Sequence, residues 1–207
     1  MADGYRVSLK PVPVAERAAA LEAALTAHGL LKSGFVEKFT DHAEEQLDPR
    51  KGARMVARAW TDAAFRERLL RDGKSAAAEM DFGMPEYHGR LVVLENTVNV
   101  HNIIVCTLCS CTASTIIGAP PDWYKDLEYR ARVVRESRNV LREMGLYLPP
   151  SIEIRVWDTT TDTRYMVLPM QPPTTTGWSQ ERLAAIVTQE SMIGISRLDM
   201  IDTQTEG

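Results

Sequence analysis

All three cysteines of this 207-residue chain lie within six consecutive positions, as Cys106, Cys109 and Cys111, in the segment NIIVCTLCSCTAS (102–114). An odd number of cysteines packed this closely does not make the cross-linked framework of a small disulfide-stapled protein. The chain therefore has to fold around a hydrophobic core. With 44% hydrophobic and 25% charged residues, its composition is sufficient for one sizeable core, or for a core plus an arm.

The charge and hydropathy patterns exclude several kinds of partner. A net charge of −4 gives no basic surface for nucleic acid or for an anionic membrane. No apolar run approaches the length of about 18 residues that a membrane span requires. The N-terminal residues lack a basic segment followed by an apolar one, so we see no secretory signal and expect a cytoplasmic protein.

Residues 1–50 differ in pattern from the rest of the chain. Apolar residues at helical spacing predict one helix that starts near Val14 and is closed by Gly29, and a second that is opened by Ser33. Both helices have narrow apolar stripes and long polar faces, and such helices rarely fold alone. Residues 1–50 are therefore either an arm that wraps a partner subunit or two helices docked on this chain's own core.

Residues 51–207 show strands interleaved with helices, and we expect them to form a second domain. The expected strands are 90–97, 102–106, 151–158 and 163–169, and the expected helices are two between 52 and 73, one at 128–145 and one at 179–189. Thr61 and Ser179 are the predicted helix caps, Gly73 is a predicted stop, and the proline-rich segment 118–126 is a predicted loop. The last two strands are expected to pair as a hairpin, which favours a layered α+β domain over a doubly wound parallel sheet.

The clustered cysteines favour a site for one soft metal ion such as zinc, iron or cobalt. Three thiols fall one short of the four side-chain ligands of common zinc and iron–sulfur sites, and His101 is better explained as a surface or interface residue at a strand end. A tight Cys-Ser-Cys turn can add the backbone nitrogens of Ser110 and Cys111, which gives five donors and one open position for catalysis. The alternative is three reduced cysteines packed as small apolar residues.

The segment VCTLCSC (105–111) resembles the metal-binding signature of the nitrile hydratase α subunit. The resemblance extends over roughly residues 50–195, through PPDWYK, EYRARVVRESRNVL, IEIRVWDTTTDTRYMVLP, GWSQERLAAIVT and ESMIG. It implies a four-layer α-β-β-α fold in which residues 51–207 are the metal-binding catalytic domain. It also implies that residues 1–50 are an N-terminal helical arm that wraps a β-type subunit, and that the reaction is the hydration of a nitrile to an amide. That subunit, as one chain or two smaller ones, would complete the active site, and a metal-loading activator protein is a further implied partner.

The resemblance also implies roles for the residues of the loop. Cys106 would be the axial thiolate, and Cys109 and Cys111 would be equatorial ligands oxidised to sulfinic and sulfenic acid. The backbone nitrogens of Ser110 and Cys111 would complete the ligand set, and the Cys111 sulfenate oxygen would act as nucleophile or base. Thr107 resembles the cobalt(III) branch of the family, whereas Thr112 and the residue after it look more like the iron(III) branch, and we predict cobalt.

This sequence departs from the family where the substrate pocket is expected. Ser114 occupies a position where family members commonly have tryptophan, which removes a large aromatic wall. Tyr87 and His88 stand where a glutamine is often found, and Thr112 is the fourth expected pocket residue. We predict a pocket for a bulkier nitrile, heteroaromatic or nucleoside-like, of which toyocamycin is an example.

Asp158 and Arg164 flank a turn, and in the family the equivalent pair lies near the metal loop. The alternative for this pair is a surface salt bridge worth less than about 1 kcal/mol. The arginines of segment 128–145 are expected to form mostly a solvated helix face.

Two other functions stay open at this stage. The catalytic γ-type subunit of thiocyanate hydrolase shares VCTLCSC, and activity on thiocyanate would distinguish it. A non-catalytic metal-binding or redox-sensing module would keep unoxidised cysteines and need no β-type partner.

Overall fold

The structure is a computed structural model that describes residues 12–200, without the side chains of residues 42–45. The outer ends of the predicted arm and of the predicted catalytic domain, residues 1–11 and 201–207, lie outside the described residues. The chain divides into two compact units between Glu45 and Gln46. Each unit is described by itself.

The first unit contains α1 (Val14–Ala27) and all of α2 (Phe35–Gln46) except its last residue. The predicted first helix is confirmed, and Gly29 after it has the positive φ of 68° that favours glycine. The second helix was predicted to start at Ser33, but α2 begins two residues later, at Phe35. No residue of α1 is buried. Whether these helices pack on a partner subunit stays a prediction.

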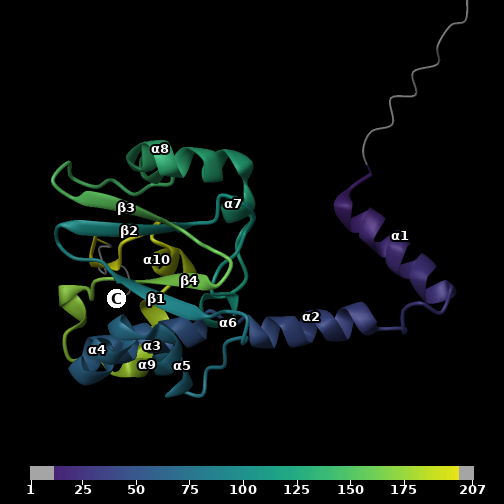
Figure 1. The fold of residues 1–207 in the computed structure, drawn as a ribbon, viewed down its shortest axis with the longest axis horizontal. Helices are drawn as coiled ribbons and strands as arrows, with labels where there is room; N and C mark the ends of the chain where they lie inside the picture. The colour runs from purple at the N-terminus through teal and green to yellow at the C-terminus, as the bar shows by residue number, and fades with distance from the viewer. Residues whose placement is uncertain (1–11, 201–207) are drawn as a thin grey trace, which may run out of the picture. The chain divides into compact units, whose positions relative to one another are not determined.

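The second unit has helices on both outer faces of two small sheets (Figure 1). Helices α7 and α8 lie along the sheet of β2 and β3, and helices α3, α4, α5 and α9 cover the sheet of β1 and β4. This arrangement is the predicted four-layer α-β-β-α fold of the α+β class. Its elements are α3 (Arg50–Thr61), α4 (Ala63–Arg71), α5 (Gly73–Ala78), β1 (Arg90–Glu95), β2 (Val100–Val105), α6 (Ser114–Ile117), α7 (Asp122–Lys125), α8 (Leu127–Glu143), β3 (Glu153–Asp158), β4 (Thr163–Leu168), η1 (Pro173–Thr175), α9 (Gln180–Ile186), α10 (Gln189–Ile193) and η2 (Leu198–Met200).

The predicted hairpin between the last two strands is wrong. β3 pairs in parallel with β2, and β4 pairs in parallel with β1, so the short segment between β3 and β4 crosses from one sheet to the other. Alternating apolar residues identify a strand, but they do not identify the strand with which it pairs. Here both faces of each sheet are covered, so the pattern gives no information about which sheet a strand joins. The consequence for the site is that β2 and β3 end side by side, with Val105 opposite Asp158.

Two predicted helix boundaries are also wrong. Asp62, not Thr61, caps α4, because its carboxylate accepts a hydrogen bond from the Phe65 amide at 2.9 Å. Gly73 does not end a helix but begins α5. A Cβ atom at Gly73 would lie 2.6 Å from the carbonyl oxygen of Leu91, so the close approach of α5 to β1 requires glycine.

Other boundaries are closer to expectation. Ser179 caps α9 as predicted, because its hydroxyl accepts from the Arg182 amide at 3.3 Å. The predicted loop 118–126 contains the short helix α7. Within the part of the chain that is described, no helix is both long and apolar enough to cross a membrane.

His101 was expected at the surface, but it is fully buried in the middle of the domain. The Asn96 side-chain oxygen accepts from the Asn102 amide at 2.7 Å, so the Asn96 nitrogen donates to His101 Nδ1 at 3.2 Å. His101 Nε2 then carries the proton and donates to the Gly194 carbonyl at 2.7 Å. Burial lowers the pKa of His101 to about 4, and the positive charge of Arg197 acts in the same direction. His101 is therefore a neutral core residue that fixes β2, and it is not a metal ligand.

Candidate metal centre

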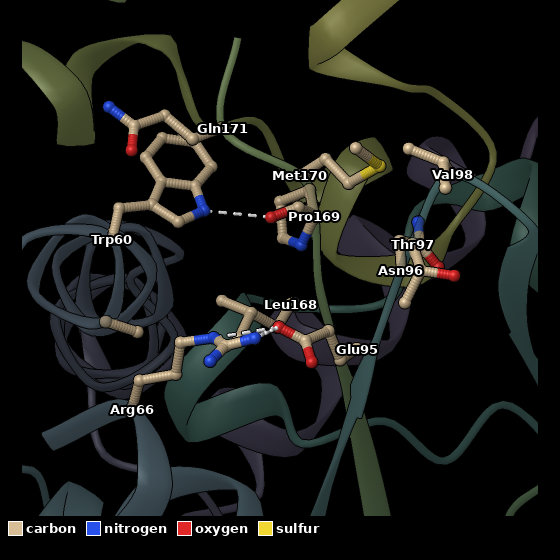
Figure 2. Close-up of a pocket in the computed structure, with 11 residues that line it drawn as sticks. Trp60, Arg66, Glu95, Asn96, Thr97, Val98, Leu168, Pro169, Met170 and Gln171 are labelled. Atoms are coloured by element: carbon tan, nitrogen blue, oxygen red, sulfur yellow. Dashed lines mark hydrogen bonds and ion pairs between the residues drawn. The ribbon is translucent and has the colours of Figure 1, made fainter. Parts of the chain in front are cut away.

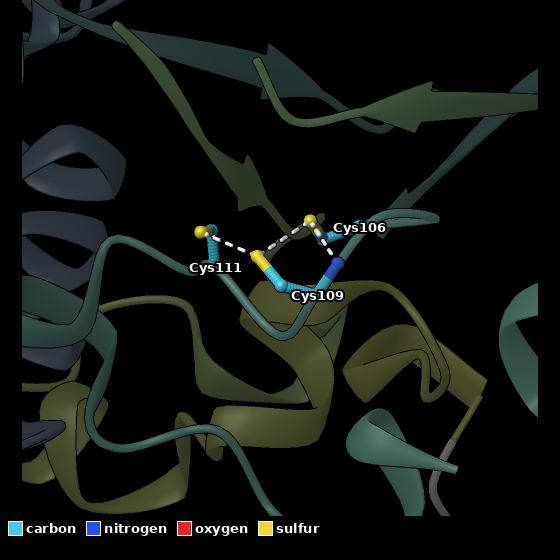
Figure 3. A group of neighbouring side chains, drawn as sticks. All are labelled: Cys106, Cys109 and Cys111. Atoms are coloured by element: carbon cyan, nitrogen blue, oxygen red, sulfur yellow. Dashed lines mark hydrogen bonds between the residues drawn. The ribbon is translucent and has the colours of Figure 1, made fainter. Parts of the chain in front are cut away.

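The three thiols meet at the point where β2 ends. Residues 106–111, called the cysteine loop below, follow Val105 directly and bring the three sulfur atoms within 4.8 Å of one another (Figure 3). Cys106 Sγ lies 3.4 Å from Cys109 Sγ, which lies 2.8 Å from Cys111 Sγ. Cys106 is buried, Cys111 is half-buried and Cys109 is exposed. The alternative of three buried packing cysteines is therefore wrong.

The start of the cysteine loop is tied to the end of β3. Asp158 accepts a hydrogen bond from the Thr107 amide at 3.0 Å and another from the Thr107 hydroxyl. The parallel pairing of β2 with β3 places this carboxylate beside the loop. The described residues contain no ion pair between Asp158 and Arg164, so the surface salt bridge considered for this pair is wrong.

The end of the loop is held through the Cys111 carbonyl group. The Tyr124 hydroxyl donates to this oxygen at 3.1 Å, and the Thr159 hydroxyl donates at 3.4 Å. Tyr124 is fully buried and packs edge-on against Trp123. Burial raises the pKa of Tyr124, so its hydroxyl keeps the proton that it donates.

The middle of the loop is held by an arginine that the sequence placed on a solvated helix face. Arg130 Nη1, from the first turn of α8, donates to the Cys109 carbonyl oxygen at 2.6 Å. Arginines recur at five positions of the segment, and nothing in their spacing singles out Arg130. The structure therefore adds to the site a residue that sequence analysis missed.

The thiols differ in acidity. Burial opposes ionisation of Cys106, but hydrogen bonds from Thr159 and from the amides of Cys109 and Cys111 outweigh it and lower the pKa of Cys106 to about 7. A hydrogen bond with Cys109, burial and the negative charge of Cys106 raise the pKa of Cys111 to about 11. Because the thiolate is the form that binds metals, Cys106 is better prepared to bind one than Cys111 is.

The donor set fits a soft metal ion. Three sulfur atoms converge, and thiolates select such ions. Among residues 12–200, no group accepts a hydrogen bond from the Ser110 amide, so this nitrogen in the middle of the loop remains uncommitted. The three sulfur donors expected from the sequence are thus brought together in one loop, and the backbone nitrogens of Ser110 and Cys111 stay predicted ligands.

The predicted pocket residues lie on two segments. Thr112 is buried with no partner for its hydroxyl, and Ser114 is half-buried as the first residue of α6. Tyr87 and His88 precede β1, with Tyr87 74% exposed and His88 buried. Arg164 donates to the Thr160 carbonyl at 2.6 Å.

Arg164 connects these segments electrostatically. Burial, followed by the positive charges of Arg164 and Lys74, lowers the pKa of His88. The same Arg164 charge acts on Cys111, where it favours the thiolate. Arg164 therefore influences both the cysteine loop and the predicted pocket residue His88.

A separate cavity of about 440 Å³ lies where β1 and β4 end, and it is called the β1–β4 hollow below (Figure 2). Trp60 Nε1 donates to the Pro169 carbonyl at 2.9 Å, and Arg66 forms an ion pair with Glu95. None of the residues predicted for the site lines this hollow.

The domain has four α-β-β-α layers, and three thiols converge where one of its strands ends. Proteins of this class can hold a metal ion on the cysteine loop. The family model for "Nitrile hydratase, alpha chain" matches residues 12–196. This chain therefore belongs to the nitrile hydratase α-chain family.

Individual relatives agree with this assignment. The cobalt-containing nitrile hydratase α subunit of Pseudonocardia thermophila is 44% identical, with 88% of this chain and 89% of that protein covered. A double mutant of the Fe-type nitrile hydratase from Comamonas testosteroni Ni1 superimposes with a TM-score of 0.82 at 51% identity, covering 89% of both chains. The thiocyanate hydrolase γ subunit of Thiobacillus thioparus is more distant, at 39% identity over 72% of this chain and 66% of that protein.

Proposed function

We propose that this chain carries the catalytic metal centre of a nitrile hydratase. The sulfur atoms of Cys106, Cys109 and Cys111 and the backbone nitrogens of Ser110 and Cys111 would be its ligands. The observation that carries this proposal is the convergence of three thiols within one loop, in a chain of this family. The Ser110 amide of the same loop has no acceptor among residues 12–200.

We propose cobalt(III) as the ion. Thr107 inside the loop supports cobalt, as do the cobalt-containing relatives. The similarity to an Fe-type enzyme makes iron(III) the alternative outcome. Metal analysis of the purified protein decides between the two.

The proposed reaction adds one water molecule across the carbon–nitrogen triple bond of a nitrile and yields the amide. A bound trivalent ion supplies Lewis acidity to polarise the nitrile or to acidify water. Cys109 and Cys111 would be present as sulfinic and sulfenic acid, and the Cys111 oxygen would serve as nucleophile or base towards the nitrile carbon. Asp158 holds the start of the loop through Thr107, and Tyr124 and Thr159 hold its end through the Cys111 carbonyl.

We also propose that a β-type subunit, as one chain or two smaller ones, completes the site. The exposure of the loop supports this, because Leu108 at its tip is 89% exposed and Cys109 is exposed beside it. Exposed apolar groups at a chemical site are typical of an interaction surface. The apolar side chains of α1 and α2, such as Val14 and Phe39, would offer a second contact for this partner. A metal-loading activator is a further proposed partner.

The proposed substrate is a bulky or heteroaromatic nitrile. Ser114 is a small, half-buried residue at the start of α6, three positions after the loop, where a tryptophan would add a large aromatic group. Ser114→Trp should reduce kcat/KM for a heteroaromatic nitrile at least about tenfold more than for acetonitrile, because an indole excludes the larger molecule. Equal losses on both substrates would contradict this role.

The decisive experiment is metal analysis and peptide mass spectrometry on the chain co-produced with its β-type partner. We expect stoichiometric cobalt and about three added oxygen atoms on the peptide containing residues 102–114. Assays with a nitrile and with thiocyanate then separate the proposed activity from that of thiocyanate hydrolase. Unmodified thiols without cobalt or iron, even beside the partner, would overturn the proposal and favour a non-catalytic module.

A further inference from the structure

The arginines of α8 have different surroundings, and Arg130 stands apart from its neighbours. Arg132 forms ion pairs with Glu128, Glu136 and Glu143. Arg138 donates to the carbonyl groups of Leu148, Pro149 and Ile152. Within residues 12–200, no carboxylate pairs with Arg130, and its Nε atom is buried without a hydrogen-bond partner. Its Nη1 atom donates to the Cys109 carbonyl oxygen at 2.6 Å.

The position of Arg130 is fixed by the start of α8. Asp126 caps the helix by accepting from the Tyr129 amide at 2.9 Å. The Tyr129 ring is buried and packs edge-on against Trp123 at 5.1 Å. Arg130 is the next residue, so the helix cap and the aromatic packing together bring its guanidinium group to the cysteine loop.

The carbonyl that Arg130 contacts belongs to the peptide group whose nitrogen is that of Ser110. Resonance shares electron density between the oxygen and the nitrogen of one peptide group. A nitrogen that carries negative charge as a metal ligand therefore places much of that charge on the Cys109 oxygen. A cationic donor at that oxygen stabilises the charge about twice as strongly as a neutral donor does.

The carbonyl of Cys111, which is also held by hydrogen bonds, has only neutral donors. The Cys111 oxygen accepts from two neutral hydroxyl groups, those of Tyr124 and Thr159. Its peptide group contains the nitrogen of Thr112, which lies outside the proposed ligand set. The charged donor is thus placed on the peptide group that supplies a proposed ligand, and the neutral donors are placed on one that does not.

We propose that Arg130 is a positioning residue of the metal centre, whose cation orients the Cys109–Ser110 peptide group and neutralises the charge that this group carries when Ser110 N binds the metal. This inference rests on the proposed function. It predicts that the charge of Arg130 matters more than its size.

The test compares Arg130→Met, Arg130→Gln and Arg130→Lys with Arg135→Met in the complex co-produced with the β-type partner. Arg135 is an exposed arginine of the same helix, and its Nε atom contacts only the Ala131 carbonyl of its own helix. Three quantities are measured: the rate of metal loss to a chelator, the sulfur-to-metal charge-transfer absorption band, and the midpoint of thermal unfolding.

We expect Arg130→Met and Arg130→Gln to lose metal about ten to a hundred times faster than the wild type and to shift the absorption band. Arg130→Lys keeps a cation and should restore most of the retention, and Arg135→Met should behave as the wild type. Because glutamine and lysine both donate hydrogen bonds, they decide the question even if Arg130→Met does not assemble.

Two results would overturn the inference. One is an unchanged absorption band and metal-loss rate in Arg130→Gln. The other is a lowered unfolding midpoint with an unchanged band, which would mean that Arg130 supports the fold alone. A wild-type complex without bound metal would instead refute the proposed function itself, so the two failures are distinguishable.

Discussion

The cysteine loop and the β1–β4 hollow occupy equivalent places in the fold, but their polar groups differ. Each lies where a parallel pair of strands ends, β2 with β3 for the loop and β1 with β4 for the hollow. In the hollow, Trp60 is paired with a carbonyl group and Arg66 with Glu95. In the loop, three thiols lie within 4.8 Å of one another with no ion pair, and the Ser110 amide has no acceptor among residues 12–200.

Unsatisfied buried polar atoms show the same contrast. Thr112 and Thr115, which follow the loop in sequence, and Arg130, which contacts it, each have a buried side-chain atom without a hydrogen-bond partner. His88, Arg164, Ser196 and Arg197 have such an atom elsewhere in the domain. Among the described residues that line the hollow, none has such an atom. Since buried polar groups are normally paired, the unpaired atoms beside the loop fit a group that binds there, such as the proposed metal ion or a water molecule. The comparison teaches that, in this fold, clustered polar groups without partners identify the functional site better than the presence of a cavity does.

The largest expected effect comes from removing a thiol of the loop. Cys109→Ala removes a proposed ligand, and loss of the ion's Lewis acidity is worth several kcal/mol. We expect metal content to fall close to zero and nitrile hydration to fall on the order of a thousand-fold or more. Metal analysis and kinetic assays on the purified complex measure both. If Cys109→Ala kept the wild-type metal content and activity, the cysteine loop would be no more a functional site than the β1–β4 hollow.

The next effect concerns His101, whose partner Asn96 also lines the hollow. The folded-state pKa of about 4 lies below the ordinary value of 6.5, so the folded protein binds fewer protons than the unfolded chain between these values. Stability from this group is fully present above pH 6.5 and is lost as the pH falls towards 4. The loss amounts to about 3 kcal/mol.

Denaturant unfolding at a series of pH values tests this expectation. His101→Gln cannot titrate, so its free energy of unfolding should vary less with pH between 4 and 6.5 than that of the wild type. The nearby charges of Arg197 and Asp199 are the same in both proteins and cancel in the difference. Equal pH dependence would show that His101 is solvated.

A smaller effect is expected for Tyr124→Phe. The ring would keep its packing, but the hydrogen bond to the Cys111 carbonyl would be lost, at a cost of about 1 kcal/mol in unfolding free energy. Thermal denaturation measures the loss, and chelator-induced metal release should also be faster. A stability equal to that of the wild type would mean that Thr159 alone holds this carbonyl.

The smallest effect is expected in the hollow. Arg66 and Glu95 are partly exposed, and ion pairs of this kind contribute about 0–1 kcal/mol. Arg66→Met should therefore leave metal content and kcat/KM unchanged and lower the unfolding free energy by less than about 1 kcal/mol. A large loss of activity in Arg66→Met would show that the hollow takes part in the function after all.

Much of the fold could be predicted from the sequence, because local patterns determine it. The α+β class, the strands and most helix positions follow from periodicity, and the Ser179 cap follows from residue type. The four-layer arrangement followed from the resemblance to the family. The hairpin prediction failed because strand pairing depends on which faces the helices cover, and this is decided by contacts distant in sequence.

The same limit applies to the candidate site. The cysteine cluster is visible in the sequence because its residues are adjacent. Arg130 and Tyr124 reach the loop through α8 and α7, and only tertiary structure shows which arginine and which tyrosine do so. His101 was placed at the surface for the same reason, since burial of a polar side chain by Gly194 and Asn96 leaves no local signature. The roles of Ser114, Tyr87 and His88 stay predictions.

The break in α8 has a consequence for how this surface tolerates change. Glu136 has non-helical angles, with φ −139° and ψ 44°, so the helix consists of two segments with separate tasks. The segment before Glu136 carries Arg130 to the cysteine loop, and the segment after it carries Arg138 to the carbonyl groups of residues 148–152. Substitutions in 145–152 would therefore act first on the contacts of Arg138 in the second segment, and they would reach the loop through the ion pairs of Arg132 with Glu136 and Glu143 that bridge the break.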